Sequence, residues 1–586
     1  MENNALKPVS AAGRAPAPTP QTPATVQRNA LDLYVRSQVA RATGGVSPIA
    51  MRLAFQDWWQ HLAMAPGKRS ELAGYWLGML AGAGQGGAPD EDARFADDAW
   101  RSWPFAWYAR GFKQLEQFWA EATRAVPGVS PHHADVVAFT ARQLLDMWSP
   151  SNYPLTNPEV LRSALATGGR SVINGALNWR KDLCRHLAPP GAAVSEPVGE
   201  RYVPGQDVAL TPGMVVYRNE LIELLHYSPQ SATVYREPVL IVPSWIMKYY
   251  ILDLSPHNSL VRYLVQQGHT VLMISWRNPD AGDRDLGMEH YLQRGLFAAL
   301  DQVHALGGAA VHAVGYCLGG TLLSIGAAAM EDGAHHTRAK FASLTLLAAQ
   351  TDFTEPGELA LFIDDSELAF LDALMWDQGY LDGDQMAASF QLLRARDLVW
   401  SRMMREYLLG ERSAPNDLMT WNADSTRLPF KMHSEYLHRL FLHNDLAEGR
   451  YLVAGKPVAL SDIQAPMFVL GTERDHVSPW RSVYKVHLLC GGTIDFVLAS
   501  GGHNAGIVSE PGHANRSYRS QPANAAPTGY RSPEEWLSQA ECRQGSWWPH
   551  WQQWLARHSD RSRIAAPPVG TGPVLGPAPG QYVLAS

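Results

Sequence analysis

One short motif constrains the fold of this chain more than any other feature: residues 315–320 read Gly-Tyr-Cys-Leu-Gly-Gly. An apolar, strand-like run, Ala309–Val314, precedes the motif, and an apolar helical run follows it. A strand, a sharp turn and a helix in this order form a nucleophile elbow, which presents its central residue at the end of the strand. Glycines beside that residue lack Cβ atoms, so the strand and the helix can pack closely around the turn. The motif predicts an α/β fold with Cys317 as nucleophile, although alone it also permits a glycine-rich turn around a buried, inert cysteine.

Five further apolar runs are typical of strands buried on both faces of a parallel sheet. They are Val239–Pro243, Thr270–Ser275, Leu344–Leu347, Met467–Leu470 and Ile494–Leu498. Residues 352–450, which separate the third and fourth of these five runs, have a helical and aromatic pattern. They predict a helical lid inserted into the sheet.

The regions outside the sheet differ in composition. Residues 1–27 are rich in proline and poor in large apolar side chains, so we expect a disordered tail. Residues 28–200 carry apolar residues at helical spacing, which predicts a helical N-terminal domain. The catalytic domain would then span 201–586 and end in a proline-rich tail over 567–586, in which Tyr582–Leu584 could still dock.

Composition and charge exclude several classes of protein. The formal net charge is −7 and the basic residues do not cluster, so we expect no nucleic-acid partner. Four cysteines without CxxC spacing exclude a disulfide scaffold and indicate a reducing compartment. No signal peptide is visible, and no apolar run reaches the ~18–20 residues of a membrane span. No metal-ligand spacing or nucleotide-binding motif is convincing, so neither a metal nor a cofactor is expected.

Two more residues complete a candidate catalytic triad. Asp475 follows the predicted strand Met467–Leu470, and His503 follows Ile494–Leu498. Alone, the aspartate would be a loop acid or a helix cap, and the histidine a polar loop residue. With Cys317 they occur in the order nucleophile, acid, base, at strand ends where α/β-hydrolase sites lie. We therefore predict an α/β-hydrolase fold with a helical lid, preceded by a mostly helical N-terminal domain.

Backbone groups near the elbow are candidates for stabilising an oxyanion. The amide of Leu318 lies at the helix N-terminus behind Cys317, where the helix dipole also favours a thiolate. A second donor is expected from the loop after Val239–Pro243, around Trp245 or Ile246.

Several neighbouring groups have alternative interpretations. His476 could line the site, although adjacent residues usually face different ways. Asp253 could cap a helix, form a salt bridge or contact the substrate. The remaining cysteines, Cys184, Cys490 and Cys542, lack the elbow context and are expected to be ordinary thiols.

A cysteine at the elbow suits acyl transfer better than hydrolysis. A thioester substrate passes its acyl group to Cys317 at nearly constant free energy, and the acyl group stays activated for the next acceptor. His503 would take the thiol proton and later the proton of an attacking hydroxyl, while Asp475 would orient His503. An aromatic lid would exclude water from the intermediate. The residues leave open whether His503 or Asp475 activates the attacking hydroxyl.

Longer motifs give the chain a resemblance to a known family over roughly residues 90–586. Besides the elbow, they are Asp92–Trp100, Ser149–Val160, Lys248–Leu254, Ser275–Pro279, Trp421–Thr426, Asp475–Trp480 and Gly502–His503. Together they resemble the poly(3-hydroxyalkanoate) synthases, the bacterial polyester polymerases, and in particular the single-subunit class I type that prefers short acyl groups.

The resemblance implies that Cys317 carries the growing chain as a thioester, with Asp475 and His503 completing the triad. It implies an (R)-3-hydroxyacyl-CoA substrate such as 3-hydroxybutyryl-CoA, with polyester and free CoA as products. It also implies a cytoplasmic homodimer attached to polymer granules, with the N-terminal domain affecting dimerisation and granule contact. One Cys317, or two across a dimer, could hold chain and monomer.

The predicted oxyanion loop departs from the family pattern. Residues 242–248 read VPSWIMK where the family often has PPCINK or PPQINK, so the bulk of Trp245 could change the shape of the site and its substrate preference. Asn504 also stands where isoleucine is more usual. Two other functions compete with the polymerase: a Cys-dependent thioesterase or depolymerase of the same fold, and a granule-coating subunit without catalysis.

Overall fold

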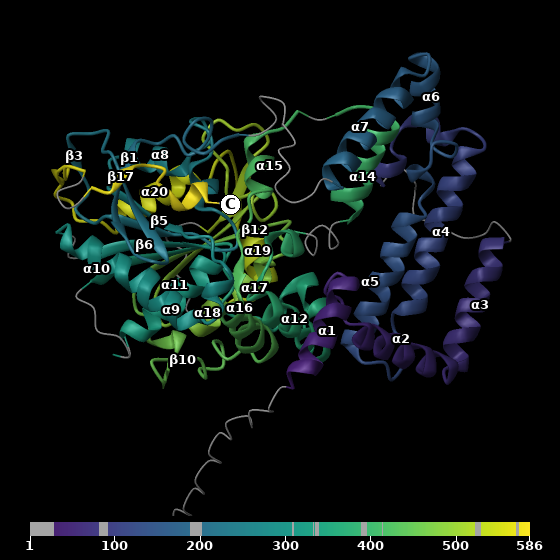
Figure 1. The fold of residues 1–586 in the computed structure, drawn as a ribbon, viewed down its shortest axis with the longest axis horizontal. Helices are drawn as coiled ribbons and strands as arrows, with labels where there is room; N and C mark the ends of the chain where they lie inside the picture. Colours follow the sequence, from purple (N-terminus) through teal and green to yellow (C-terminus); the bar gives the residue numbers. More distant parts are fainter. Residues whose placement is uncertain are drawn as a thin grey trace, which may run out of the picture.

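The computed structural model describes residues 29–80, 92–187, 202–307, 310–331, 333, 339–387, 395–412, 414–521, 529–569 and 574–585. The tail expected over 1–27 lies outside the described residues. The N-terminal helices stand to one side of a large sheet, and helices from the middle of the chain lie between the two (Figure 1).

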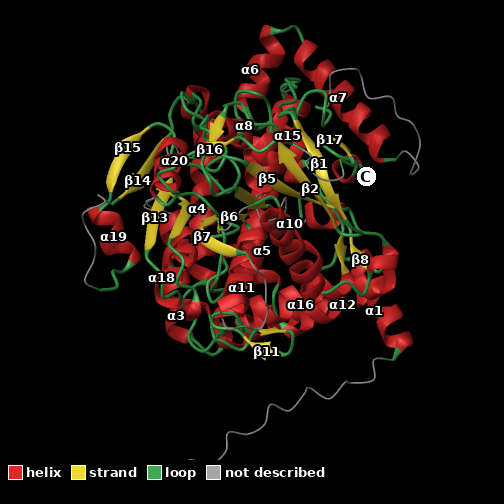
Figure 2. Ribbon diagram, turned by 90° about the vertical axis from the view of Figure 1, so that its left-hand side faces the viewer, coloured by secondary structure: helices red, strands yellow, loops and turns green. Residues whose placement is uncertain are grey.

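A mixed sheet of eleven strands organises the described part of the C-terminal region. Its order is β15 (Glu541–Gln544), β14 (Ser517–Ser520), β13 (Ile494–Ala499), β12 (Met467–Thr472), β7 (Lys340–Leu347), β6 (Ala310–Tyr316), β4 (Val239–Val242), β5 (Val271–Trp276), β2 (Ile222–Tyr227), β1 (Gly213–Arg218) and β17 (Gly576–Pro577). The neighbours from β13 to β5 run parallel. The strands beyond them pair antiparallel, with β14 and β15 at one edge and β2, β1 and β17 at the other (Figure 2). The parallel strands are the six that the sequence predicts, and the predicted fold class is confirmed.

Continuous apolar runs form the central strands because helices cover both faces of the sheet (Figure 1). Every residue of β4 and β5 is buried. Helix α11 (Leu318–Glu331) packs on one face, while α8 (Leu260–Gln266) and α20 (Trp548–Arg557) pack on the other. Since β6 lies between β4 and β7, the elbow that follows it lies near the middle of the row formed by the C-terminal ends of the parallel strands.

Helices make up the described N-terminal region, as predicted. They are α1 (Ala30–Ala42), α2 (Pro48–Ala63), α3 (Pro66–Leu80), α4 (Phe105–Thr123), α5 (Pro131–Met147), α6 (Pro158–Ala166) and α7 (Arg170–His186). Apolar residues on α4 pack against neighbouring helices. Its Phe112 is buried, and Phe118 and Trp119 pack against a cluster that contains Trp58 of α2.

The insertion expected as a lid contacts both parts of the molecule. Helix α12 (Asp365–Gln378) packs against α1, and α16 (Phe430–Tyr436) packs against α12. The helical turns at 396–408 instead lie beside α7, at a distance from the sheet (Figure 1). There Tyr407 Oη donates a hydrogen bond to Asp182 Oδ2 at 3.0 Å. The insertion therefore connects the N-terminal helices to the catalytic sheet.

Residues 574–585 return to an edge of the sheet, where β17 pairs with β1. Val583 is buried in the core on the α8 side, and Tyr582 Oη donates a hydrogen bond to Asn219 O at 2.6 Å. Across the ranges described above, no helix combines the length and the apolar character needed to cross a bilayer.

Candidate active site

Cys317 occupies the sharp turn between β6 and α11, with a left-handed φ of 52°. A non-glycine residue in this conformation is strained, and such strain concentrates at functional sites. Gly319 allows the turn, because a Cβ atom there would lie 2.0 Å from the carbonyl oxygen of Val242 at the end of β4. On the other side, the Cys317 amide donates a hydrogen bond to Leu347 O of β7 at 2.9 Å. Both neighbouring strands thus fix the position of the turn.

Asp475 and His503 meet at the same end of the sheet as Cys317, in the loops that follow the C-terminal ends of β12 and β13. His503 Nδ1 lies 2.8 Å from Asp475 Oδ2, and Thr472 Oγ1 donates to the same oxygen at 2.9 Å. The amides of Val477 and Ser478 donate to Asp475 Oδ1 at 2.9 and 2.8 Å. The Asp475 side chain is fully buried, and that of His503 is 14% exposed. Because Nδ1 is held by the carboxylate, Nε2 of His503 is the nitrogen left for the reacting groups.

The charges in this cluster shift the pKa values of His503 and Asp475 in opposite directions. Burial alone would lower the pKa of His503, but the charges of Asp475 and Cys317 and their hydrogen bonds to the ring raise it well above its usual value. Burial also disfavours an ionised carboxylate, yet the charge and hydrogen bond of His503 keep the pKa of Asp475 below its usual value. The structure therefore brings all three predicted triad residues into one interacting group.

The predicted oxyanion donors lie on α11 and on the loop after β4. Leu318 is the first residue of α11, so its amide belongs to the first-turn N–H groups that have no acceptor within the helix. The amide of Ile246 donates to Ser244 Oγ at 3.3 Å. An oxyanion near Cys317 would have to draw this second amide away from the serine hydroxyl.

Trp245, whose bulk was expected to affect the site, is accommodated in the core. Its side chain is 2% exposed and packs against Trp276 and Tyr291, with ring centroids 6.0 and 5.1 Å away. Trp276 Nε1 in turn donates to Pro243 O at 2.9 Å. The tryptophan ring thus supports the loop from behind.

The other groups noted in the sequence lie outside the triad. His476 is exposed, and Asp253 is buried and accepts hydrogen bonds from two neighbouring hydroxyls. Cys184 and Cys542 are exposed, and burial raises the pKa of Cys490 to about 12. Within the described residues, no group of three His, Cys, Asp or Glu side chains is placed to hold a metal ion.

Sequence reasoning missed two contributions of the insertion to the site. Tyr436 is buried in the core cluster against which Cys317 packs; burial raises the pKa of its hydroxyl well above the usual value, and the charge of Cys317 adds to the shift. Residues 421–426 form hydrogen bonds with the loop after β4. The aromatic pattern of 352–450 signals neither contact, because it does not tell which rings and which backbone groups turn toward Cys317.

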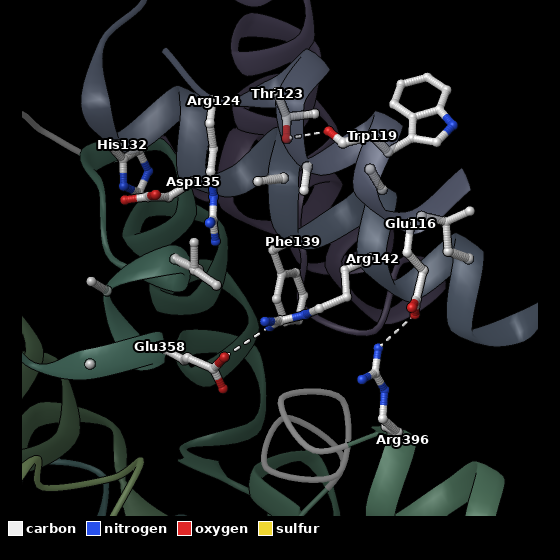
Figure 3. Close-up of a pocket in the computed structure, with 17 residues that line it drawn as sticks. Glu116, Trp119, Thr123, Arg124, His132, Asp135, Phe139, Arg142, Glu358 and Arg396 are labelled. Atoms are coloured by element: carbon white, nitrogen blue, oxygen red, sulfur yellow. Dashed lines mark hydrogen bonds and ion pairs between the residues drawn. The ribbon is translucent and has the colours of Figure 1, made fainter. Parts of the chain in front are cut away.

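A separate cleft of about 470 Å³ lies between α4, α5 and the insertion. Figure 3 shows two ion pairs there, with Arg142 directed at Glu358 and Arg396 at Glu116, at 2.8 and 3.1 Å. Its lining carries charges of both signs and no serine or cysteine. We interpret this cleft as the junction between the N-terminal helices and the insertion.

The geometry around Cys317 supports nucleophilic acyl chemistry. A sulfur on a strained turn, a histidine oriented by a buried carboxylate and a helix N-terminus for a developing oxyanion are the groups that this chemistry uses.

Three regions of the chain match known families. Residues 27–68 match the family described as "Poly-beta-hydroxybutyrate polymerase N terminal", and residues 91–264 match "Poly-beta-hydroxybutyrate polymerase (PhaC) N-terminus". Residues 237–510 match "alpha/beta hydrolase fold". The third match agrees with the observed sheet.

Full-length comparison finds relatives that cover most of the chain. A poly(3-hydroxyalkanoate) polymerase of Methylorubrum extorquens is 39% identical over 500 residues, which are 84% of this chain and 81% of the relative. A polymerase subunit PhaC of Rhizobium meliloti is 37% identical over 496 residues, covering 84% and 79%. The corresponding subunit of Cupriavidus necator is 35% identical over 525 residues, covering 88% and 87%.

Proposed function

The chain belongs to the poly(3-hydroxyalkanoate) polymerases, which are acyltransferases, and we propose that it links (R)-3-hydroxyacyl groups from CoA thioesters through a thioester on Cys317. The proposed substrate is 3-hydroxybutyryl-CoA, since the sequence resembles the class that prefers short acyl groups. One observation carries the proposal: a strained elbow cysteine lies beside a His503–Asp475 pair with a 2.8 Å hydrogen bond.

In the first half-reaction, Nε2 of His503 accepts the thiol proton and Cys317 Sγ attacks the substrate carbonyl. The negative charge moves to the carbonyl oxygen, where the Leu318 amide and a donor from loop 244–246 stabilise it. The carbon–sulfur bond to CoA then breaks, and His503 returns the proton to the departing sulfur. One thioester replaces another, so the acyl group keeps its reactivity.

In the second half-reaction, a 3-hydroxyl oxygen attacks the acyl group on Cys317. An ester bond forms, the bond to Sγ breaks, and the hydroxyl proton passes through His503 to the sulfur. We assign the base to His503 because both oxygens of Asp475 are already occupied by donors and its side chain is fully buried. Asp475 stabilises the imidazolium that forms.

The surroundings of the cysteine favour transfer over hydrolysis. Tyr436 of the insertion is buried in the core cluster against which Cys317 packs, and the side chain of Asp475 has no exposed surface. A thioester held in such surroundings meets less water than one in an open cleft.

We further propose that the N-terminal helices contact a polyester granule in the cytoplasm and that the enzyme acts as a homodimer. Large apolar side chains are exposed on these helices and the turns between them, among them Trp103 (88% exposed) and Met64 (84%). Exposed apolar surface of this kind marks contact surfaces in soluble proteins. Replacing Trp103 and Trp107 with serine should weaken binding to polyester particles without slowing acyl transfer to a soluble acceptor.

The test uses purified protein with (R)-3-hydroxybutyryl-CoA and compares it with Cys317→Ala. Release of CoA together with a high-mass polyester, both lost in the variant, is the expected result. Release of CoA with only free 3-hydroxybutyrate would make the protein a hydrolase. No CoA release from this or a longer 3-hydroxyacyl-CoA would leave the granule-coating role.

A further inference from the structure

We propose that Lys248 and Asp424 form a buried clamp that positions the oxyanion loop 244–247, and that the main chain at residues 583 and 585 completes it. The inference rests on the proposed function, because a donor on this loop matters only if Cys317 is acylated. Both residues are positioning residues, which act through the loop backbone.

The contacts of Lys248 satisfy its ammonium group completely. Nζ lies 3.0 Å from Asp424 Oδ1 and donates to Val583 O at 2.7 Å and to Ala585 O at 2.9 Å. An ammonium group has three N–H donors, and three acceptors surround it. The two side chains are only 6% and 10% exposed. The second oxygen of Asp424 accepts a hydrogen bond from Tyr250 Oη at 2.9 Å.

The loop ahead of Lys248 is held through its carbonyl groups. Thr426 takes two of them, its amide donating to Ile246 O at 2.9 Å and its hydroxyl to Trp245 O. Trp421 Nε1 donates to Lys248 O at 2.7 Å. These bonds hold the peptide units that carry the N–H groups of Ile246, Met247 and Tyr249, so an oxyanion has to compete only with the 3.3 Å bond to Ser244 Oγ for the Ile246 amide. An N–H group held in this way is what an oxyanion donor requires.

The segment that supplies the two carbonyl acceptors is itself anchored. Glu223 is fully buried on β2 and accepts the amides of Gln581 and Tyr582 at 2.9 and 3.0 Å. The same carboxylate pairs with Arg218 at 2.5 Å. Residues 581–585 are therefore a fixed support for Lys248.

The residues that lead into the loop from β4 contact the nucleophile turn directly. A Cβ atom on Gly319 would lie 2.0 Å from Val242 O and 2.6 Å from Pro243 O. Because this contact leaves no free space, a shift of the loop changes the position of the elbow, and the two oxyanion donors move relative to each other. The clamp holds one side of the loop and the elbow holds the other. Together they fix the distance between the two oxyanion donors.

Stability alone does not explain the pair. Taking two charges out of water costs free energy that their attraction only partly returns, and an apolar pair of similar size is often as stable. The charges bring geometry that an apolar pair cannot, since three directed hydrogen bonds fix Nζ between the loop, the insertion and residues 583–585.

The experiment separates the oxyanion hole from the nucleophile. Lys248→Met keeps an unbranched side chain as far as the ε position and removes the ammonium group. Lys485→Met is the matched control, because Lys485 also forms an ion pair, with Glu355 at 2.8 Å. For each protein we would measure the rate of acylation by p-nitrophenyl acetate and the rate of Cys317 alkylation by iodoacetamide, read on its peptide by mass spectrometry. Acylation passes through an oxyanion, whereas alkylation does not.

We expect acylation to slow about 10²-fold in Lys248→Met, the size of effect seen when one oxyanion donor is lost, with alkylation unchanged within twofold. Lys485→Met should match the wild type in both assays. Equal slowing of acylation and alkylation would reduce the clamp to a general structural role, and unchanged acylation in a folded variant would overturn the proposal. If Lys248→Met does not fold, Asp424→Asn replaces it, with slowing of acylation alone by threefold or more as the criterion.

These assays do not depend on the polymerase reaction. p-Nitrophenyl acetate acylates Cys317 without a 3-hydroxyacyl group or CoA, so the clamp can be tested in a protein that fails to make polyester. Conversely, a wild-type protein that polymerises while Lys248→Met acylates normally would refute the clamp and leave the proposed function intact.

Discussion

Replacing Asp475 with asparagine tests the assignment of the triad most directly. Two backbone amides, from Val477 and Ser478, donate to Oδ1, so the carbonyl oxygen of the asparagine must take that position. Its NH₂ group then takes the place of Oδ2. In the wild-type protein, Oδ2 lies 2.8 Å from His503 Nδ1. An amide N–H facing Nδ1 donates to it, and the ring proton moves to Nε2.

A histidine protonated on Nε2 cannot accept the proton of Cys317. The loss expected for this tautomer in a catalytic triad is about 10⁴-fold in kcat, which corresponds to about 5.4 kcal/mol of transition-state stabilisation. We would measure CoA release at saturating (R)-3-hydroxybutyryl-CoA. Alkylation of Cys317 by iodoacetamide should slow as well, in contrast to Lys248→Met, because here the base itself fails.

Thr472→Val is the matched control for this variant. It removes the hydroxyl that donates to Asp475 Oδ2 at 2.9 Å and keeps the carboxylate. One hydrogen bond to a charged group contributes about 1.5–3 kcal/mol, so the loss should stay near ten- to a hundredfold. An asparagine variant that keeps more than a tenth of wild-type activity would refute the triad as described.

Three further perturbations test other parts of the structure. Gly319→Ala should reduce acylation at least tenfold with little change in secondary structure by circular dichroism, since its Cβ would lie 2.0 Å from Val242 O. Asp146→Ala should lower the free energy of unfolding by about 3–5 kcal/mol, because the buried carboxylate pairs with Arg94 and Arg396, whereas Arg396→Ala, at a partly exposed side chain, should cost about 1 kcal/mol in denaturant titrations. Burial lowers the pKa of His226 to about 4, so the unfolded chain, with a pKa near 6.5, takes up the proton first and stability falls as the pH drops from about 6.5 to 4. Between pH 7.5 and 5, the free energy of unfolding of His226→Phe should therefore fall by about 2 kcal/mol less than that of the wild type. An equal fall in the two proteins would contradict the lowered pKa of His226.

The central strands could be predicted because each is buried on both faces. Val239–Val242 and Val271–Trp276 are continuous apolar runs, and such runs form parallel strands under helices on either side. The flanking strands were not predicted. Glu541–Gln544 is polar and largely exposed, and it is a strand because it pairs with Ser517–Ser520. Partner choice at a sheet edge is set by long-range packing, which no local pattern contains.

The grouping of Cys317, Asp475 and His503 could be predicted because the proposed chemistry requires these residue types in a characteristic order at the ends of strands. The clamp could not. Lys248 and Asp424 lie far apart in the sequence. Lysine and aspartate are usually exposed, so neither residue signals a buried ion pair. Their pairing depends on how the insertion folds back on the loop after β4. The same limit applies to Trp245, whose bulk suggested a change in the site although its ring lies in the core.

The insertion forms hydrogen bonds both with an N-terminal helix and with the loop after β4. One part of it, at 396–408, packs on helix α7, where Tyr407 pairs with Asp182. Another part, at 421–426, binds the carbonyl groups of the oxyanion loop. In the proposed mechanism the enzyme must retain a reactive thioester until the next hydroxyl arrives, and water that enters when the loop is displaced would end the chain by hydrolysis. In that mechanism, a loop held from three sides, by the elbow, the insertion and residues 583–585, would favour transfer over hydrolysis.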